Sequence, residues 1–193
     1  MKLLEDRILS DGEVIDGKIL KVSSFLNHQI DVAFLDALAK EWKKRFASAR
    51  ITKILTIESS GIAVACSLAR ELGVPLVFAK KSRTSNVNED VYSSRVYSFT
   101  HDEFYTVVVS KKFLGAGDRI LLADDFLANG NALKGLLEIC GSAGAEVVGA
   151  ACAVEKGFQN GGDELRGRGI AVESLAIIDK MDSDGIEFRK EEV

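Results

Sequence analysis

Two adjacent carboxylates, Asp124 and Asp125, stand where an apolar strand gives way to a loop of small residues. The run before them, residues 120–122, is typical of a strand buried on both faces, and ligands of α/β sheets bind beyond the carboxyl ends of such strands. The loop that follows, here called the phosphate loop, consists of Ala128, Asn129, Gly130, Asn131 and Ala132. Its backbone N–H groups and the positive end of the next helix suit a monophosphate without help from Lys or Arg.

A purely structural alternative has the carboxylates cap the turn while Gly130 supplies a positive φ. A cap needs only one carboxylate, so two behind a buried strand favour a ligand site. The three residues Ser59, Ser60 and Gly61, here called the serine turn, follow the predicted strand 51–57 at the same edge. A pyrophosphate loop and a capping turn are both compatible with these residues. Lys80 and Lys81 follow the next strand and suit the same anion, although such a pair is often only solvated.

Residues 82–101 are too polar and too long for an ordinary connection in a compact domain. We expect a flexible lid that closes over the reacting centre and excludes water. A disordered insertion is the alternative, and the aromatic residues Tyr92, Tyr97 and Phe99 count against it. Residues 92–99 also alternate weakly, as in a hairpin.

The elements that position these residues form an α/β pattern. Apolar residues recur every four positions over residues 29–46, which predicts an amphipathic helix. Residues 51–57, 62–72 and 76–79 predict a strand, a helix and a parallel strand with a right-handed crossover. Further strands are predicted at residues 104–109, 119–123, 147–154 and 171–178, and a helix at residues 131–142. The sequence therefore predicts a parallel sheet covered by helices.

Composition fits one main domain of 193 residues with 47% hydrophobic content. The net charge of −4 lacks the basic footprint of a nucleic-acid-binding protein. Charges near the N-terminus, and the lack of a long apolar run, predict a cytoplasmic protein with no membrane partner. Cys66, Cys140 and Cys152 are widely spaced among apolar residues, so we expect reduced packing residues and no zinc cluster.

The segment from residue 120 to residue 132, ILLADDFLANGNA, resembles the phosphoribosyl pyrophosphate (PRPP) motif of type I phosphoribosyltransferases. Within this segment, the sequence DDFLANGNA resembles the xanthine phosphoribosyltransferase family in particular. The likeness extends through VYSFT (96–100), VSKKFL (109–114) and EKGFQ (155–159), and so covers nearly the whole chain. Ser usually stands in that family where this chain has Gly157.

The resemblance implies the type I phosphoribosyltransferase fold: a twisted parallel sheet flanked by helices, a lid loop, and a small hood built from both chain ends. Residues 1–193 would form one domain, in which residues 1–29 and about 156–193 supply the base-binding hood. The phosphate loop would bind the 5-phosphate of PRPP, Asp124 and Asp125 would face the ribose hydroxyls as catalytic residues, and Ser59, Ser60, Gly61 and Lys81 would meet the pyrophosphate. Mg²⁺ would be held mainly by substrate oxygens and water, with no protein ligand. A homodimer is also implied.

Purine contacts are implied for Leu20, Asn27, Lys156 and Phe158. The Lys156 ammonium suits a 6-oxo group and rejects an amino group there, Asn27 would bind the 2-oxo edge, and Phe158 would stack on the base. Taken alone, the residues permit a surface lysine, a helix-capping Asn27 and a core Phe158.

The implied activity is transfer of phosphoribosyl from PRPP to xanthine in purine salvage, which gives xanthosine 5'-monophosphate and pyrophosphate. A hypoxanthine or guanine enzyme is the near alternative, because few contacts decide base choice. A regulator of the same fold that senses PRPP and binds nucleic acid is the distant alternative, and the acidic charge counts against it.

Overall fold

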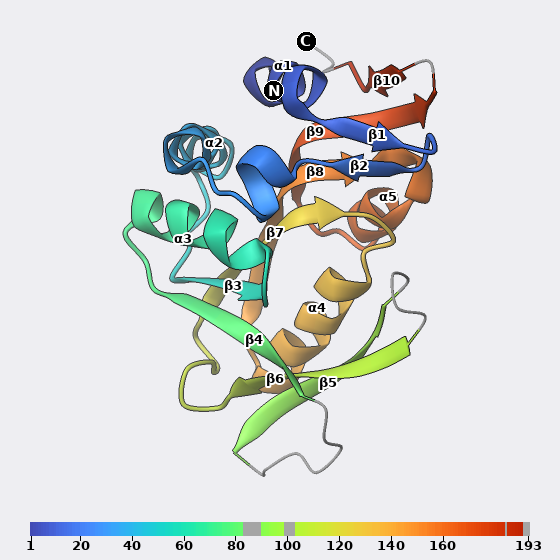
Figure 1. Ribbon diagram of the computed structural model, residues 1–193. Coiled ribbons are helices and arrows are strands. Elements are labelled where there is room, and N and C mark those ends of the chain that lie inside the picture. Colours follow the sequence, from blue (N-terminus) through green and yellow to red (C-terminus); the bar gives the residue numbers. More distant parts are fainter. Residues whose placement is uncertain (83–89, 99–102, 184, 191–193) are drawn as a thin grey trace.

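The computed structural model describes residues 1–82, 90–98, 103–183 and 185–190. Its main sheet has eight strands in the order β10-β9-β8-β7-β3-β4-β6-β5 (Figure 1). The central strands are parallel: β3 (Lys53–Ile57), β4 (Leu76–Ser82), β7 (Arg119–Leu127), β8 (Glu146–Lys156) and β9 (Val172–Asp182). The edge strands are antiparallel: β5 (Val91–Ser98), β6 (Glu103–Ser110) and β10 (Gly185–Phe188).

The described strands refine two predictions. The weak alternation at residues 92–99 does mark a hairpin, because β5 and β6 pair from Val91 with Ser110 to Ser98 with Glu103. The remainder of the expected lid, residues 83–89 and 99–101, lies outside the described residues, so the lid stays a prediction. Strand β7 also runs past its predicted end to Leu127, since its pairing with β8 continues there.

Helices cover both faces of the sheet. Neighbouring residues of β7 point to opposite faces: Leu121 packs with α1 (Lys2–Asp11), α2 (Val32–Arg45) and α3 (Gly61–Leu72), whereas Leu122 packs with α4 (Asn131–Ala143) and α5 (Gly161–Gly167). Helices α2, α3 and α4 match the predicted ranges closely. Several short elements were not predicted: α1, α5, the β1–β2 hairpin (Glu13–Ile15 and Ile19–Lys21), a π-helical turn η1 (Ser23–Asn27) and a 3-10 turn η2 (Gly157–Gln159).

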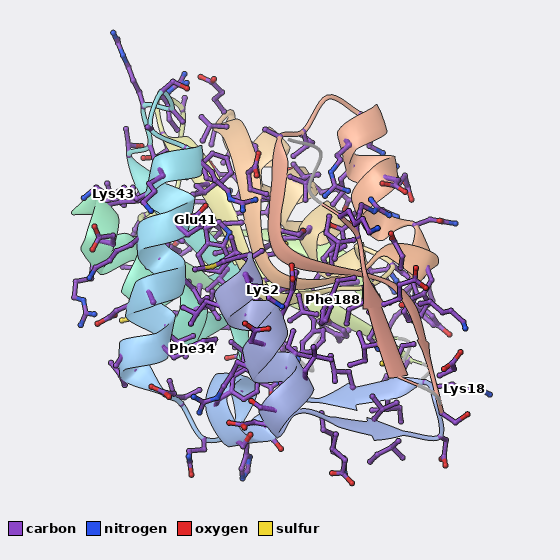
Figure 2. The ribbon with its side chains drawn as sticks, turned by 90° about the horizontal axis from the view of Figure 1, so that it is seen from above. Lys2, Lys18, Phe34, Glu41, Lys43 and Phe188 are labelled. Carbon is purple, nitrogen blue, oxygen red and sulfur yellow. The ribbon has the colours of Figure 1, made fainter. Side chains whose placement is uncertain are left out.

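The two chain ends meet on one side of the molecule. Helix α1 and the β1–β2 hairpin lie beside β9 and β10 (Figure 1), and the view from above has Lys2 of α1 near Phe188 of β10 (Figure 2). The ammonium of Met1 donates a hydrogen bond to the Leu175 carbonyl. The hairpin turn also approaches β9, because a Cβ at Gly17 would lie 3.1 Å from the Asp182 Cα. The pieces expected to form the hood are therefore in contact.

The cysteines differ in their surroundings. Cys140 and Cys152 are buried, and burial raises the pKa of Cys140 to about 12 and that of Cys152 as well, so both act as packing residues. Cys66 is exposed on α3, which differs from the packing role expected of it. None of the described helices is long and apolar enough to cross a bilayer.

Candidate functional site

A cavity of about 630 Å³ opens at the carboxyl end of β7. It is lined by Ile19, Tyr97, Tyr105, Asp124, Phe126, Leu127, Ala128, Asn129, Gly130, Asn131, Ala132, Leu133, Lys156 and Gln159. The strands β7 and β3 are neighbours in the sheet. The chain leads from β7 to β8 on one side of this pair, and from β3 to β4 on the other side. Such a switch point, where the strand order reverses, is the usual ligand crevice of open α/β sheets. The structure thus brings the whole predicted phosphate loop, Asp124 and Lys156 to one cavity.

The two aspartates are buried at the end of β7. Asp124 is 7% exposed and Asp125 is 5% exposed, and the Asp125 N–H donates to Asp124 Oδ1 at 3.0 Å. Burial, and next the charge of Asp125, raise the pKa of Asp124 well above its usual value. The ionised form of Asp124 is therefore disfavoured, so a positive charge that develops beside it is favoured.

Asp125 connects three of the predicted subsites. Its Oδ1 accepts a hydrogen bond of 2.9 Å from Ser60 Oγ, and its Oδ2 accepts one of 3.1 Å from Asn27 Nδ2. Ser60 belongs to the serine turn and Asn27 to the N-terminal piece. Asp124 lines the cavity, whereas Asp125 holds these two segments against the sheet.

Close packing at Gly61 lets α3 begin beside Asp124. A Cβ at Gly61 would lie 2.5 Å from Thr56 Oγ1 and 3.0 Å from Asp124 Oδ1. The buried Thr56 Oγ1 has no hydrogen-bond partner among the described residues. Any side chain at residue 61 would therefore displace either the strand β3 or the aspartate.

The phosphate loop is fixed from two sides. Gly130 precedes α4 with φ of 74°, a conformation that favours glycine. Asn131 Nδ2 donates to the Tyr97 carbonyl on β5 at 3.2 Å, and Lys134 Nζ donates to the Asn129 carbonyl at 3.1 Å. The structural role of Gly130 and the proposed anion site are thus compatible with each other.

Lys81 lies at the same edge, outside the cavity lining. Its exposed ammonium sits 5.1 Å from the centre of the Tyr105 ring, and its backbone N–H donates to Glu58 Oε1 at 2.5 Å. Tyr105 itself lines the cavity, and burial together with the charge of Asp124 raises its pKa. The Tyr105 side chain therefore lies between the Lys81 ammonium and the cavity, and Lys81 is on the side of the serine turn.

Lys156 projects into the cavity from the end of β8. Burial lowers the pKa of its half-buried ammonium. Within the described part of the chain, this ammonium makes no hydrogen bond or ion pair. Phe158 is 43% exposed and does not line the cavity, so the core alternative is wrong and stacking on a base stays a prediction. Gln159, which was not singled out, lines the cavity instead.

The N-terminal contribution differs in detail from the expectation. Leu20 is 6% exposed and packs in the core, whereas its neighbour Ile19 is 54% exposed and lines the cavity. Alternation along a strand explains the difference, because adjacent residues point to opposite sides.

Gly157, where the resembled family usually has serine, is closely packed. A Cβ there would lie 2.7 Å from Asp179 Oδ1, so a serine requires that side chain to shift.

Sequence reasoning missed Ile19, Tyr97, Tyr105 and Gln159. Only Tyr97 carried a signal, as part of the aromatic patch in the predicted hairpin. The described residues contain no group of three or more His, Cys, Asp or Glu side chains placed to hold a metal ion. The Asp124 carboxyl, which lines the cavity, is an oxygen donor of the kind that suits Mg²⁺ or its water ligands.

Comparison with known proteins decides the family. Residues 21–188 match the model described as "Phosphoribosyl transferase domain". The chain belongs to the phosphoribosyltransferase family. The xanthine phosphoribosyltransferase of Bifidobacterium adolescentis is 54% identical, with 98% of this chain and 100% of that protein covered. Its counterpart in Clostridium novyi is 51% identical over the same shares.

Solved structures support the same fold. The APRTase of Giardia lamblia, complexed with 9-deazaadenine, is 26% identical with a TM-score of 0.76, covering 90% of this chain and 96% of that chain. The adenine phosphoribosyl transferase of Trypanosoma brucei is 19% identical with a TM-score of 0.70, covering 92% of this chain and 80% of that chain. The expected type I phosphoribosyltransferase fold is therefore confirmed.

Proposed function

We propose that this enzyme transfers the 5-phosphoribosyl group from PRPP to xanthine, giving xanthosine 5'-monophosphate and pyrophosphate in purine salvage. The observation that carries the proposal is the meeting of Asp124, the phosphate loop and the Lys156 ammonium in one cavity. The identity of 51–54% to xanthine phosphoribosyltransferases over nearly the full chain supports xanthine as the base.

In the proposed reaction, the bond between ribose C1 and a pyrophosphate oxygen breaks and its electron pair leaves with pyrophosphate. N9 of the purine forms the new bond to C1, and the N9 proton passes to water. Charge on ribose becomes positive in the transition state, and the carboxyl pair of Asp124 and Asp125 is preorganised to favour it. The phosphate loop holds the 5-phosphate through backbone N–H groups at the start of α4. The serine turn begins α3 on the pyrophosphate side.

Mg²⁺ bound to PRPP would supply charge neutralisation for the leaving pyrophosphate. Asp124 lines the cavity, so its carboxyl group would be within reach of the water ligands of such an ion. No third acidic ligand is required, because Mg²⁺ keeps several waters and substrate oxygens.

Lys156 is the residue proposed to select 6-oxopurines over 6-aminopurines. Its ammonium donates to a 6-oxo group, whereas an amino group at that position leaves a half-buried charge without an acceptor. Asn27, whose side-chain amide donates to Asp125 Oδ2, is the proposed contact to the 2-oxo edge.

Product analysis with labelled PRPP and each purine tests the proposal. We expect kcat/KM to be highest with xanthine, lower with guanine and hypoxanthine, and negligible with adenine. If xanthine is used no better than hypoxanthine or guanine, the enzyme is a different 6-oxopurine phosphoribosyltransferase. If none of the purines is converted and the protein binds DNA tightly and sequence-selectively at physiological salt, the protein is the regulator.

We also propose that the protein is a cytoplasmic homodimer. An apolar patch lies on the β4 and β6 side of the sheet, where Phe78 and Phe113, which are 38% and 60% exposed, line one groove. Burial of such a patch against a second copy is favourable. Sedimentation velocity across a dilution series measures the mass, and a monomer at all concentrations contradicts the dimer.

A further inference from the structure

A partly buried ion pair stands directly behind Lys156, the lysine proposed to bind the base. Glu155 precedes Lys156 at the end of β8 and is 1% exposed. Arg166 of α5 donates to both of its oxygens, Nη1 to Oε1 at 2.8 Å and Nη2 to Oε2 at 2.7 Å. Ser174 Oγ of β9 donates to Oε2 at 2.5 Å. A forked pair of this kind fixes orientation as well as distance.

The start of α5 is packed between this pair and the phosphate loop. A Cβ at Gly162 would lie 2.0 Å from Glu155 Oε1, and a Cβ at Gly161 would lie 2.2 Å from the Ala128 carbonyl oxygen. The two glycines therefore let the helix backbone touch the carboxylate on one side and the phosphate loop on the other.

A second connection runs along α5. Glu164 Oε2 accepts from Lys134 Nζ at 2.5 Å, and the same ammonium donates to the Asn129 carbonyl of the phosphate loop at 3.1 Å. Pairing between β7 and β8 places Leu127, the residue before the phosphate loop, opposite Glu155. Helix α5 thus bridges the segment that carries Lys156 and the loop that carries the phosphate.

A charged pair is not needed here for stability alone. Replacing a buried ion pair with apolar residues of similar volume is often neutral or stabilising, because desolvation offsets the attraction. Geometry is what a forked pair supplies and an apolar contact does not. Reaction between two held substrates depends on such geometry, since small displacements reduce the rate strongly.

We propose that the Glu155–Arg166 pair positions Lys156 and α5 relative to the phosphate loop, and thereby determines how well the purine is aligned with the ribose. The pair acts through Lys156, so both members are positioning residues. This proposal rests on the proposed function, because it assigns base selection to the cavity that holds Lys156.

The experiment compares Arg166→Lys with the unsubstituted enzyme. Lysine keeps a positive charge beside Glu155 and loses the fork, so the fold should persist. We expect kcat/KM for xanthine to fall about tenfold, with the preference over hypoxanthine reduced, while KM for PRPP changes less than about twofold. Glu155→Gln/Arg166→Gln removes both charges together and should show the same loss of preference.

The matched control is Asp118→Asn, because Asp118 forms a partly buried pair with Lys53, 2.8 Å between Oδ2 and Nζ, at the other end of the sheet. It should lower Tm without a change in base preference. If Arg166→Lys or the double variant keeps the full preference, or loses it only in proportion to Tm as the control does, the proposal is overturned. Failure of the unsubstituted enzyme to use xanthine is a separate result, which overturns the proposed function, and the variants are then compared with the purine that is used.

Discussion

The part of the cavity proposed to bind ribose phosphate and the part proposed to bind the base, here called its two halves, are built in different ways. The first comes from one continuous segment, Asp124 to Ala132, at the end of a buried strand. The second combines the end of β8, turn η2 and the N-terminal hairpin, held by contacts between residues far apart in sequence. In a continuous segment the backbone itself places the functional groups, whereas in a wall assembled from several segments their placement depends on tertiary contacts. Substitutions in the two halves should therefore change different kinetic constants.

The largest effect is expected for Asp124→Asn. Turnover should fall on the order of a hundredfold, because an amide cannot stabilise the positive ribose as a carboxylate does. Asparagine still offers an oxygen to the Asp125 N–H, so the fold should persist. Single-turnover kinetics with saturating PRPP and xanthine measure the change, and an unchanged rate would remove Asp124 from the chemistry.

Asp124→Asn should also stabilise the substrate-free protein. Burial and the charge of Asp125 raise the pKa of Asp124, so the folded state binds more protons than the unfolded state above the usual carboxyl range. Stability of the unsubstituted protein therefore decreases as pH rises from that range toward the raised pKa, and the variant lacks this loss. Urea unfolding at several pH values should show a gain that grows with pH and disappears below the usual carboxyl pKa.

Lys156→Ala should alter the other half. We expect kcat/KM for xanthine to fall about thirtyfold, the size of one hydrogen bond from a charged donor, while KM for PRPP is nearly unchanged. Lys40→Ala, an exposed lysine on α2, is the control and should have no effect. If the variant discriminates against adenine as strongly as the unsubstituted enzyme does, Lys156 does not select the base.

The difference between the halves also explains what the sequence revealed. Residues 120–132 combine a buried strand, two acids and a small loop within one stretch, and the structure places the phosphate loop and Asp124 together as expected. Leu20 and Phe158 were inferred from resemblance, and the cavity instead meets their neighbours Ile19 and Gln159. Side-chain direction in a three-residue strand or a single turn is set by tertiary packing, which periodicity does not report.

Whether a helix could be predicted from the sequence also depended on the size of its apolar face. Helices α2, α3 and α4 have caps or long apolar faces and were predicted, whereas α1 buries only Leu4 and Ile8 and was missed. Of the antiparallel edges, the β5–β6 hairpin was weakly indicated by alternation, whereas β10, a strand of 4 residues, was too short to show a pattern.

Gly61→Ala is expected to have an intermediate effect on the ribose-phosphate half. The new methyl group must displace Thr56 Oγ1 or Asp124, since it would lie 2.5 Å from the first and 3.0 Å from the second. We expect kcat/KM for PRPP to fall about tenfold, with a lower Tm. Gly141→Ala on α4 is the matched control, because nothing lies within 4 Å there, and it should stabilise the helix by about 1 kcal/mol.

Ser60→Ala should have the smallest effect, and it tests whether the serine turn acts through Asp125. It removes the hydrogen bond of 2.9 Å to Asp125 Oδ1, and the loss of one such bond predicts about a fivefold rise in KM for PRPP. If Ser60 acts by holding Asp125, its effect should shrink in an Asp125→Asn background, because residues in one network are not additive. If the two effects multiply fully, Ser60 acts on the pyrophosphate independently, and Asp125 then ties only Asn27 to the ribose-phosphate half.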